Sequence, residues 1–213
     1  MVEQRTHNPL VAGSNPAGPT TIAMKLLEEK IIELGQVKDG DVIKVDLFLN
    51  HQIDTQLIDK MADEFIRIFE EEKFTKVLTV ETSGIALAYP VAQKLGLPLV
   101  YAKKKDSVNF DGELYSSKVI SYTHFREFNV IVAKKLLNRD DNVLIIDDFL
   151  ANASDLKGLL GICQQAEVKV GGIGIAIEKA YLNAGDDLRE RGLRVESLAK
   201  IKDIDKHENK PIF

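Results

Sequence analysis

Two neighbouring carboxylates, Asp147 and Asp148, follow an apolar run and precede a short loop of small residues, so that residues 143–155 read VLIIDDFLANASD. Carboxylates accept hydrogen bonds from sugar hydroxyls and are costly to bury without such partners. The loop at residues 151–155 leads into a predicted helix, and the free amides at a helix N-terminus bind phosphoryl groups. The spacing therefore predicts a site for a sugar phosphate, with ribose hydroxyls on the carboxylates and the phosphoryl group on the loop.

The acidic pair by itself leaves other functions open. Successive strand residues point to opposite faces of a sheet, so Asp147 and Asp148 face one way only if the strand has already bent. Such a pair also follows a strand in receiver domains and nucleotidases. The pair could also bind Mg²⁺, but the ion would need further oxygen ligands nearby. A P-loop nucleotide hydrolase is disfavoured, because no GxxxxGKS or GxxxxGKT motif precedes the pair.

Helices and strands alternate along the chain and must position this loop. Apolar residues recur with helical spacing at residues 25–34, 54–72, 85–95, 154–166 and 186–191, and the last of these helices presents Arg189 on an exposed face. Alternating or continuous apolar runs predict strands at residues 41–49, 76–80, 99–104, 129–133, 143–146, 170–177 and 194–201. The polar segment at residues 105–123 predicts a long mobile loop or a β-ribbon.

This alternation predicts an α/β fold with a mostly parallel sheet flanked by helices, because βαβ crossovers are right-handed and place helices against both faces. Ligands bind such sheets outside the carboxyl ends of the strands. Three strand ends are therefore candidate sites, at residues 81–84, 147–155 and 178–179. The N-terminal helix and the C-terminal tail would form a small cap over them.

The chain of 213 residues is long enough for one α/β domain, which we place at residues 24–213. Residues 1–23 are rich in Pro, Gly and Asn and show no hydrophobic period, so we interpret them as a disordered extension. A net charge of −5 argues against nucleic acid as a partner, and no apolar run is long enough to span a membrane. The single cysteine, Cys163, suits a reducing cytoplasm.

A resemblance to a known family rests on five blocks, which are VDLFLNHQID (residues 45–54), VETSGIALA (80–88), IIDDFLAN (145–152), GIGIAIEKA (172–180) and RVESLAKI (194–201). Together they resemble the type I phosphoribosyltransferases, and among these the bacterial xanthine phosphoribosyltransferases. The resemblance implies that family's fold, in which N- and C-terminal segments form a small hood over a central sheet. It also implies a purine-salvage enzyme that joins xanthine to phosphoribosyl pyrophosphate (PRPP), with Mg²⁺ bound alongside PRPP, in a cytoplasmic homodimer.

The resemblance further implies roles for individual residues. Asp147 and Asp148 are the catalytic pair that binds the ribose hydroxyls, and the mobile segment at residues 105–123 closes over the reacting centre. The PRPP-binding residues hold the 5′-phosphate or the pyrophosphate, and they are Thr82, Ser83, Gly84, Lys103, Lys104, Ala151, Asn152, Ala153, Ser154 and Asp155. One peptide bond of the loop around Thr82 is often cis in this family. Ile43, Asn50 and Lys179 would contact the purine, and no residue is assigned as a metal ligand.

The phosphate loop, residues 151–155, departs from the family pattern. Relatives have the pattern ANGxA here, whereas this chain has ANASD. Ala153 excludes the easy positive-φ backbone that glycine provides. Asp155 places a negative charge near the proposed phosphate, unless it points away and caps the helix. Ala151 stands where hypoxanthine-guanine relatives carry an Asp that is proposed to act as a base, which argues for a different way of handling the purine proton.

Two alternatives remain open at this point. One is a phosphoribosyltransferase for another base, such as hypoxanthine, guanine or adenine. The other is a non-catalytic regulator of the same fold that binds PRPP or purines and controls transcription. Such regulators carry a basic surface or an added DNA-binding module, and neither is visible in this acidic chain. The altered phosphate loop is the feature that favours the regulator.

Overall fold

The computed structural model describes residues 22–38, 42–105, 113–121 and 126–213. Within them, one seven-stranded sheet has the order β5-β6-β4-β3-β7-β8-β9. The strands are β3 (Lys76–Val80), β4 (Leu99–Lys105), β5 (Leu114–Ser121), β6 (Arg126–Ala133), β7 (Asn142–Leu150), β8 (Lys169–Lys179) and β9 (Val195–Ile201). The five strands from β4 to β9 in this order are parallel, whereas β6 and β5 pair antiparallel at one edge. The predicted α/β fold with a mostly parallel sheet is confirmed.

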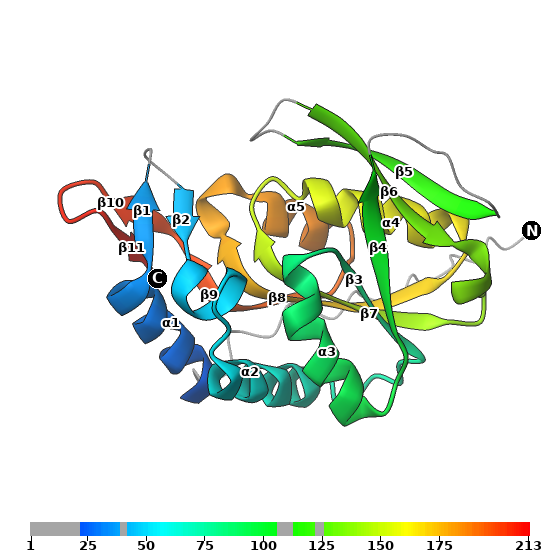
Figure 1. Ribbon diagram of the computed structural model, residues 1–213, viewed down its shortest axis with the longest axis horizontal. Helices are drawn as coiled ribbons and strands as arrows, with labels where there is room; N and C mark the ends of the chain where they lie inside the picture. Colours follow the sequence, from blue (N-terminus) through cyan, green and yellow to red (C-terminus); the bar gives the residue numbers. More distant parts are fainter. Residues whose placement is uncertain (1–21, 39–41, 106–112, 122–125) are drawn as a thin grey trace, which may run out of the picture.

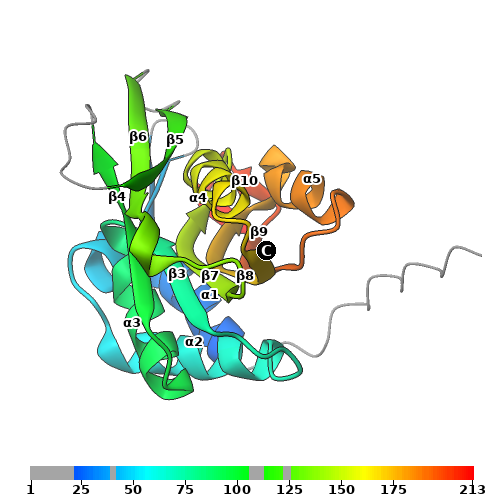
Figure 2. The same ribbon diagram turned by 90° about the vertical axis from the view of Figure 1, so that its right-hand side faces the viewer.

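Helices cover both faces of this sheet (Figure 2). On one face lie α1 (Ile22–Leu34), α2 (Thr55–Ile68) and α3 (Ser83–Leu95), and on the other lie α4 (Ser154–Gln165) and α5 (Ala184–Glu190). Strand β7 is buried on both faces. Leu144 and Ile146 pack into the core under α2 and α3, while Val143 and Ile145 pack into the core under α4. A strand buried on both faces needs apolar residues at every position.

Local signals set most of the helix ends. The carboxylate of Asp54 accepts a hydrogen bond of 3.1 Å from the Leu57 amide and caps α2. Helix α3 ends at Gly96, whose φ of 66° is the left-handed conformation that favours glycine. Helix α2 ends at Ile68, earlier than predicted, and α3 begins at Ser83, two residues earlier than predicted.

The hood at one end of the sheet consists of two hairpins and a helical turn beside α1 (Figure 1). The hairpins are β1 (Gln36–Lys38) with β2 (Val42–Lys44) and β10 (Asp203–Asp205) with β11 (Lys210–Ile212). The predicted strand at residues 41–49 is wrong beyond Lys44, because residues Asp46–Asn50 form a π-helical turn, η1. Val45, Phe48 and Leu49 are buried at spacings of three and four, which is helical and not alternating.

The polar segment predicted at residues 105–123 is described in part. Residues 106–112 and 122–125 lie outside the described residues. The described part, β5, pairs antiparallel with β6 from Leu114 opposite Ala133 to Ser121 opposite Arg126, which confirms the β-ribbon there. Short 3-10 turns, η2 (Lys134–Leu136) and η3 (Ala180–Leu182), follow β6 and β8.

The predicted N-terminal extension also falls mostly outside the description, since residues 1–21 are not described and α1 begins at Ile22. Among the described helices, none combines the length and apolar character that a membrane span requires.

Candidate functional site

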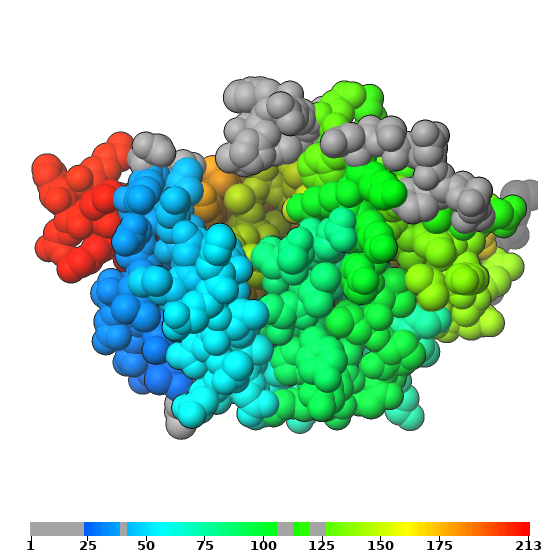
Figure 3. Space-filling model, viewed as in Figure 1, coloured from blue at the N-terminus to red at the C-terminus, as the bar shows by residue number. Residues whose placement is uncertain are grey.

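Three candidate strand ends lie at one edge of the sheet. Strands β3, β7 and β8 are parallel neighbours, so their carboxyl ends carry the turn at Glu81–Thr82, the acidic pair and Lys179 to the same edge. Figure 3 shows a hollow between the blue and cyan hood and the green segments, with olive and orange atoms of the β7–α4 and β8 regions at its back. Among the described residues, the edge of the sheet predicted as the ligand site thus lies between two projecting parts of the molecule.

Asp147 and Asp148 lie inside β7, which continues to Leu150 instead of ending at Ile146 as predicted. The strand is longer because Phe149 and Leu150 still pair with β8. Both carboxyl groups reach the start of α3 although they are neighbours in a strand. Asp148 Oδ1 accepts a hydrogen bond of 3.0 Å from the Ser83 hydroxyl, and a Cβ added at Gly84 would lie 2.8 Å from Asp147 Oδ1. Glycine is thus required where β7 approaches this helix.

Burial raises the pKa of both acidic side chains above the ordinary value. For Asp147, the negative charges of Asp148 and Asp155 add to that effect. For Asp148, the hydrogen bond from Ser83 opposes it. Only 4% of Asp147 and 6% of Asp148 is exposed, so the two carboxyl groups lack the water that would normally solvate them. Ribose hydroxyls would supply the missing hydrogen-bond donors.

The phosphate loop joins β7 to α4 in the conformation that glycine would favour. Ala153 has φ 56° and ψ 23°, and its carbonyl oxygen accepts a hydrogen bond of 2.8 Å from the Lys157 amide. The expectation that Ala153 would exclude a positive φ is wrong, because the buried side chain is held there by its surroundings. The first-turn amides of α4 have no acceptor within the helix and receive no side-chain cap, so they are available for a phosphate group.

Asp155 does not cap α4. The N-cap of this helix has no side-chain hydrogen bond, and Asp155 Oδ2 lies 2.8 Å from Lys104 Nζ. The lysine faces α4 because β4 alternates: Val100 and Ala102 pack in the core under that helix, and Lys104 continues their face. By the same alternation Lys103 points to the opposite face of β4, where it is exposed. Binding of PRPP by either lysine stays a prediction.

The turn after β3 lies beside the end of β4. The Glu81 carboxylate accepts a hydrogen bond of 2.8 Å from the Lys104 amide. The peptide bond between Glu81 and Thr82 is cis, as the family resemblance implies for this loop. Thr82 is exposed, Ser83 is half-buried and Gly84 is buried, so the first turn of α3 presents polar atoms toward the acidic pair. Thr79, below this turn, is fully buried, and its hydroxyl has no hydrogen-bond partner among the described residues.

The end of β8 contains a buried ion pair that the sequence did not reveal. Glu178 accepts hydrogen bonds of 2.9 and 2.7 Å from Arg189 Nη1 and Nη2, and a further one from the Ser197 hydroxyl. Burial alone would raise the pKa of Glu178, but these hydrogen bonds outweigh it and hold the pKa below the ordinary value. The interpretation of Arg189 as an exposed surface residue is therefore wrong. The sequence contained one indication of this pair. Glu178 ends an otherwise apolar strand, and a buried charge there needs a partner of opposite charge.

The proposed purine-binding residues lie in two places. Lys179 is half-buried and follows Glu178 at the end of β8. In the hood, Asn50 is exposed at the end of η1, whereas Ile43 is only 7% exposed and packs into the core with Val37 and Val45. Among the described residues, no three His, Cys, Asp or Glu side chains gather as a group that could hold a metal ion by themselves.

Comparison with known proteins places the chain in a family. The model of the phosphoribosyl transferase domain matches residues 45–183. The chain belongs to this family. It is similar to the xanthine phosphoribosyltransferase of Lachnoclostridium phytofermentans, with 47% identity over 89% of this chain and 98% of that protein. It is also similar to the xanthine phosphoribosyltransferase of Bifidobacterium adolescentis, with 50% identity over 85% of this chain and 95% of that protein. The resemblance drawn from the five sequence blocks is confirmed.

Solved phosphoribosyltransferase structures show the same fold. An adenine phosphoribosyltransferase from Thermoanaerobacter pseudethanolicus has a TM-score of 0.70 at 19% identity, covering 83% of this chain and 99% of that chain. The enzyme from Trypanosoma brucei, in complex with AMP, pyrophosphate and ribose-5-phosphate, has a TM-score of 0.70 at 15% identity, covering 86% of this chain and 83% of that chain. The type I phosphoribosyltransferase fold with its hood is therefore confirmed.

Proposed function

We propose that this phosphoribosyltransferase joins xanthine to PRPP and forms xanthosine 5′-monophosphate and pyrophosphate in purine salvage. The observation that carries the proposal is the convergence of the buried acidic pair on Ser83 and Gly84 beside a phosphate loop at a helix N-terminus. The relatives named above support xanthine as the base, since they share about half of their residues with this chain across most of its length.

PRPP would lie along the strand ends. The amides of Ala151, Asn152, Ala153, Ser154 and Asp155 would hold the 5′-phosphate, and Asp147 and Asp148 would accept hydrogen bonds from the ribose hydroxyls. Thr82, Ser83 and Gly84 would place the N-terminus of α3 at the pyrophosphate, where its dipole favours negative charge. The purine would contact Lys179 and the hood residues Asn50 and Ile43.

The reaction breaks the bond between ribose C1 and the pyrophosphate oxygen through an oxocarbenium-like state, and a purine nitrogen attacks C1 from the opposite face. The negative charges of Asp147 and Asp148 would stabilise the positive charge that develops on the ribose. Xanthine is acidic as a free base, so the absence of an acidic side chain at Ala151 is compatible with its use.

Mg²⁺ would enter this site together with PRPP. Mg²⁺ keeps several waters and is held by one or two carboxylates together with substrate phosphates, so a complete protein cage is not required. Asp147 and Asp148 are the oxygen donors that fit this role at the site. Bound there, the ion would neutralise charge on the departing pyrophosphate.

Base selectivity separates the proposal from its nearest rival, a phosphoribosyltransferase for hypoxanthine, guanine or adenine. Turnover should be measured with each base and PRPP, with and without Mg²⁺. We expect the highest kcat/KM with xanthine and dependence on Mg²⁺. A higher kcat/KM with another base would replace the proposed substrate, and no PRPP-dependent product with any base would leave the regulatory alternative.

The assembly and location of the protein are part of the proposal. We expect a cytoplasmic homodimer. The outward face of α3 is the candidate contact surface, because Tyr89 is 59% exposed there and the helix has no charged residue before Lys94. Analytical ultracentrifugation should give about twice the chain mass of 23.7 kDa, and a single-chain mass would exclude the dimer.

A further inference from the structure

Asp155 brings a negative charge to the loop that would hold the 5′-phosphate. It lies in the first turn of α4, and 34% of its side chain is exposed. It is the last residue of the loop at residues 151–155 and the second residue of α4, so its charge lies beside any phosphate group bound at this loop. A phosphate group bound at the loop would therefore meet repulsion from Asp155 unless another group cancels this charge.

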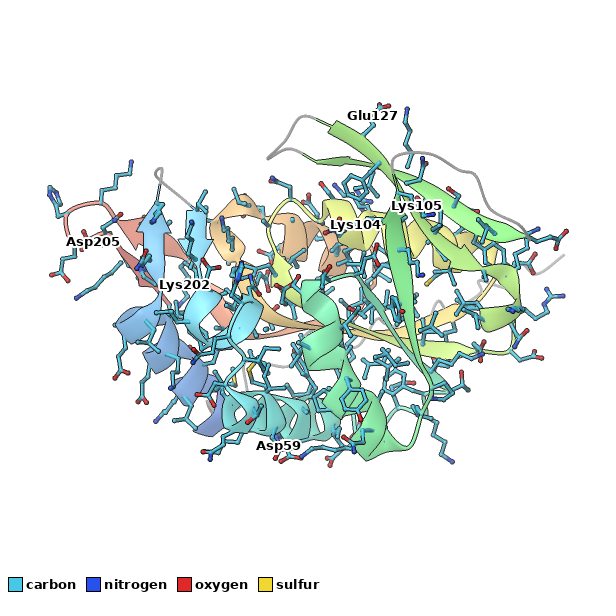
Figure 4. All side chains as sticks on the ribbon, in the orientation of Figure 1. Asp59, Lys104, Lys105, Glu127, Lys202 and Asp205 are labelled. Atoms are coloured by element: carbon cyan, nitrogen blue, oxygen red, sulfur yellow. The ribbon has the colours of Figure 1, made fainter. Side chains whose placement is uncertain are left out.

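Lys104 is placed to cancel it. Its ammonium lies 2.8 Å from Asp155 Oδ2, although the two residues are 51 positions apart in the chain. Two further contacts fix the lysine: its amide donates to Glu81 Oε1 at 2.8 Å, and its Nζ lies 5.4 Å from the centre of the Phe128 ring. Figure 4 places Lys104 near the end of β4, and its side chain extends from that strand to the start of α4.

We propose that Lys104 is a positioning residue that keeps the phosphate loop able to accept PRPP by neutralising Asp155. This inference rests on the proposed function. In this role Lys104 affects PRPP binding only by neutralising Asp155. A lysine that binds pyrophosphate directly would affect PRPP binding whether or not Asp155 is present. It also accounts for how this chain tolerates an acidic residue in the loop, because the added charge is paired within the protein.

A double-mutant cycle distinguishes the two roles. The variants are Lys104→Met, Asp155→Asn and the double variant. Methionine is an unbranched side chain of similar length to lysine, and the side chains of Lys104 and Asp155 are both about one-third exposed, so all three variants should fold. Lys104→Arg is the conservative variant, and Lys169→Met is the matched control, because Lys169 pairs with Glu72 at the opposite end of β8. The readouts are KM for PRPP, KM for xanthine and kcat.

We expect Lys104→Met to raise KM for PRPP roughly tenfold or more, because Asp155 then repels the phosphate. KM for xanthine and kcat should stay within about threefold of wild type, as expected when only the ground-state binding of one substrate changes. Adding Asp155→Asn should return KM for PRPP to within about threefold of the Asp155→Asn value, and Lys104→Arg should resemble wild type. Lys169→Met should change none of the three parameters.

A double variant as impaired as Lys104→Met would overturn the inference, since Lys104 would then act without Asp155. An unchanged KM for PRPP in Lys104→Met would overturn it as well. In both cases an active wild type leaves the proposed function intact. A wild-type protein without PRPP-dependent turnover would instead contradict the proposed function, and the inference with it.

Discussion

The hydroxyl of Ser83 donates a hydrogen bond of 3.0 Å to Asp148 Oδ1, so the first residue of α3 is joined to the carboxyl end of β7. These residues lie 65 positions apart in the chain. The contact connects the loop proposed for pyrophosphate with the carboxylates proposed for the ribose. A substrate that carries both groups would therefore be held on one rigid platform made by two neighbouring strands.

Replacing Asp148 by Asn should impair catalysis strongly. The change removes negative charge from the place where the ribose becomes positive, so we expect kcat/KM to fall by a factor on the order of 10²–10³. Steady-state turnover with xanthine and PRPP measures this. Asp140→Asn, an exposed acid before the opposite end of β7, should retain normal turnover. Normal turnover in Asp148→Asn would contradict the assignment of the ribose site.

Asp147→Asn should make the protein more stable at neutral and higher pH. Because the pKa of Asp147 is raised in the folded protein, its contribution to folding is favourable at low pH and is lost as pH rises through that pKa. The variant should therefore unfold at higher denaturant concentration than wild type near about pH 8, with a difference that shrinks toward about pH 4. Urea denaturation across this range measures the difference. If the variant were less stable than wild type at both pH values, the charged Asp147 carboxylate would not destabilise the fold, and this explanation would be wrong.

Part of this site was accessible from the sequence because the signals are local. An apolar strand followed by DD, a small-residue loop and a helical period predicts the path of residues 143–165 without knowledge of any distant contact. The continuous apolar character of β7 and β8 likewise predicts central strands of a parallel sheet. The glycine at position 96 predicts the end of α3 for the same local reason.

The remaining features depend on pairs that are distant in sequence. Neither the Lys104–Asp155 contact nor the Arg189–Glu178 pair follows from local spacing, because strand order and register decide which side chains meet. The sequence of η1 wrongly predicts a strand, because Val45, Asp46 and Leu47 alternate between apolar and polar over three residues. The left-handed Ala153 is a case in which the surrounding structure outweighs the intrinsic preference of the residue.

Ala153→Gly should stabilise the protein. A residue with a Cβ costs about 1–2 kcal/mol in the left-handed conformation, and glycine loses part of that gain through its greater freedom in the unfolded chain. We expect a net gain of up to about 1 kcal/mol in the free energy of unfolding, measured by urea denaturation. Ala151→Gly is the matched control, because Ala151 has no positive φ, and it should lose about 0.5–1 kcal/mol. Equal effects of the two substitutions would contradict this explanation.

Glu178→Gln should destabilise the protein, because it leaves Arg189 without its buried partner. Breaking a buried ion pair costs about 3–5 kcal/mol, and Arg189 is partly exposed, so we expect the lower end of this range. The lowered pKa of Glu178 means that its contribution is complete above the ordinary value of 4.5 and is lost as pH falls below it. The stability difference between variant and wild type should thus narrow in acid.

Thermal or urea unfolding at several pH values measures this difference. Glu190→Gln, on the exposed end of α5, is the control and should behave as wild type. A constant difference between Glu178→Gln and wild type from neutral pH to about pH 3 would contradict the assignment of the acid dependence to Glu178.

A crystal structure with xanthosine 5′-monophosphate bound tests the central claim most directly. We expect the 5′-phosphate on the amides of residues 151–155, the ribose hydroxyls on Asp147 and Asp148, and the purine between Lys179 and the hood. A nucleotide bound elsewhere, with the phosphate loop empty, would contradict it.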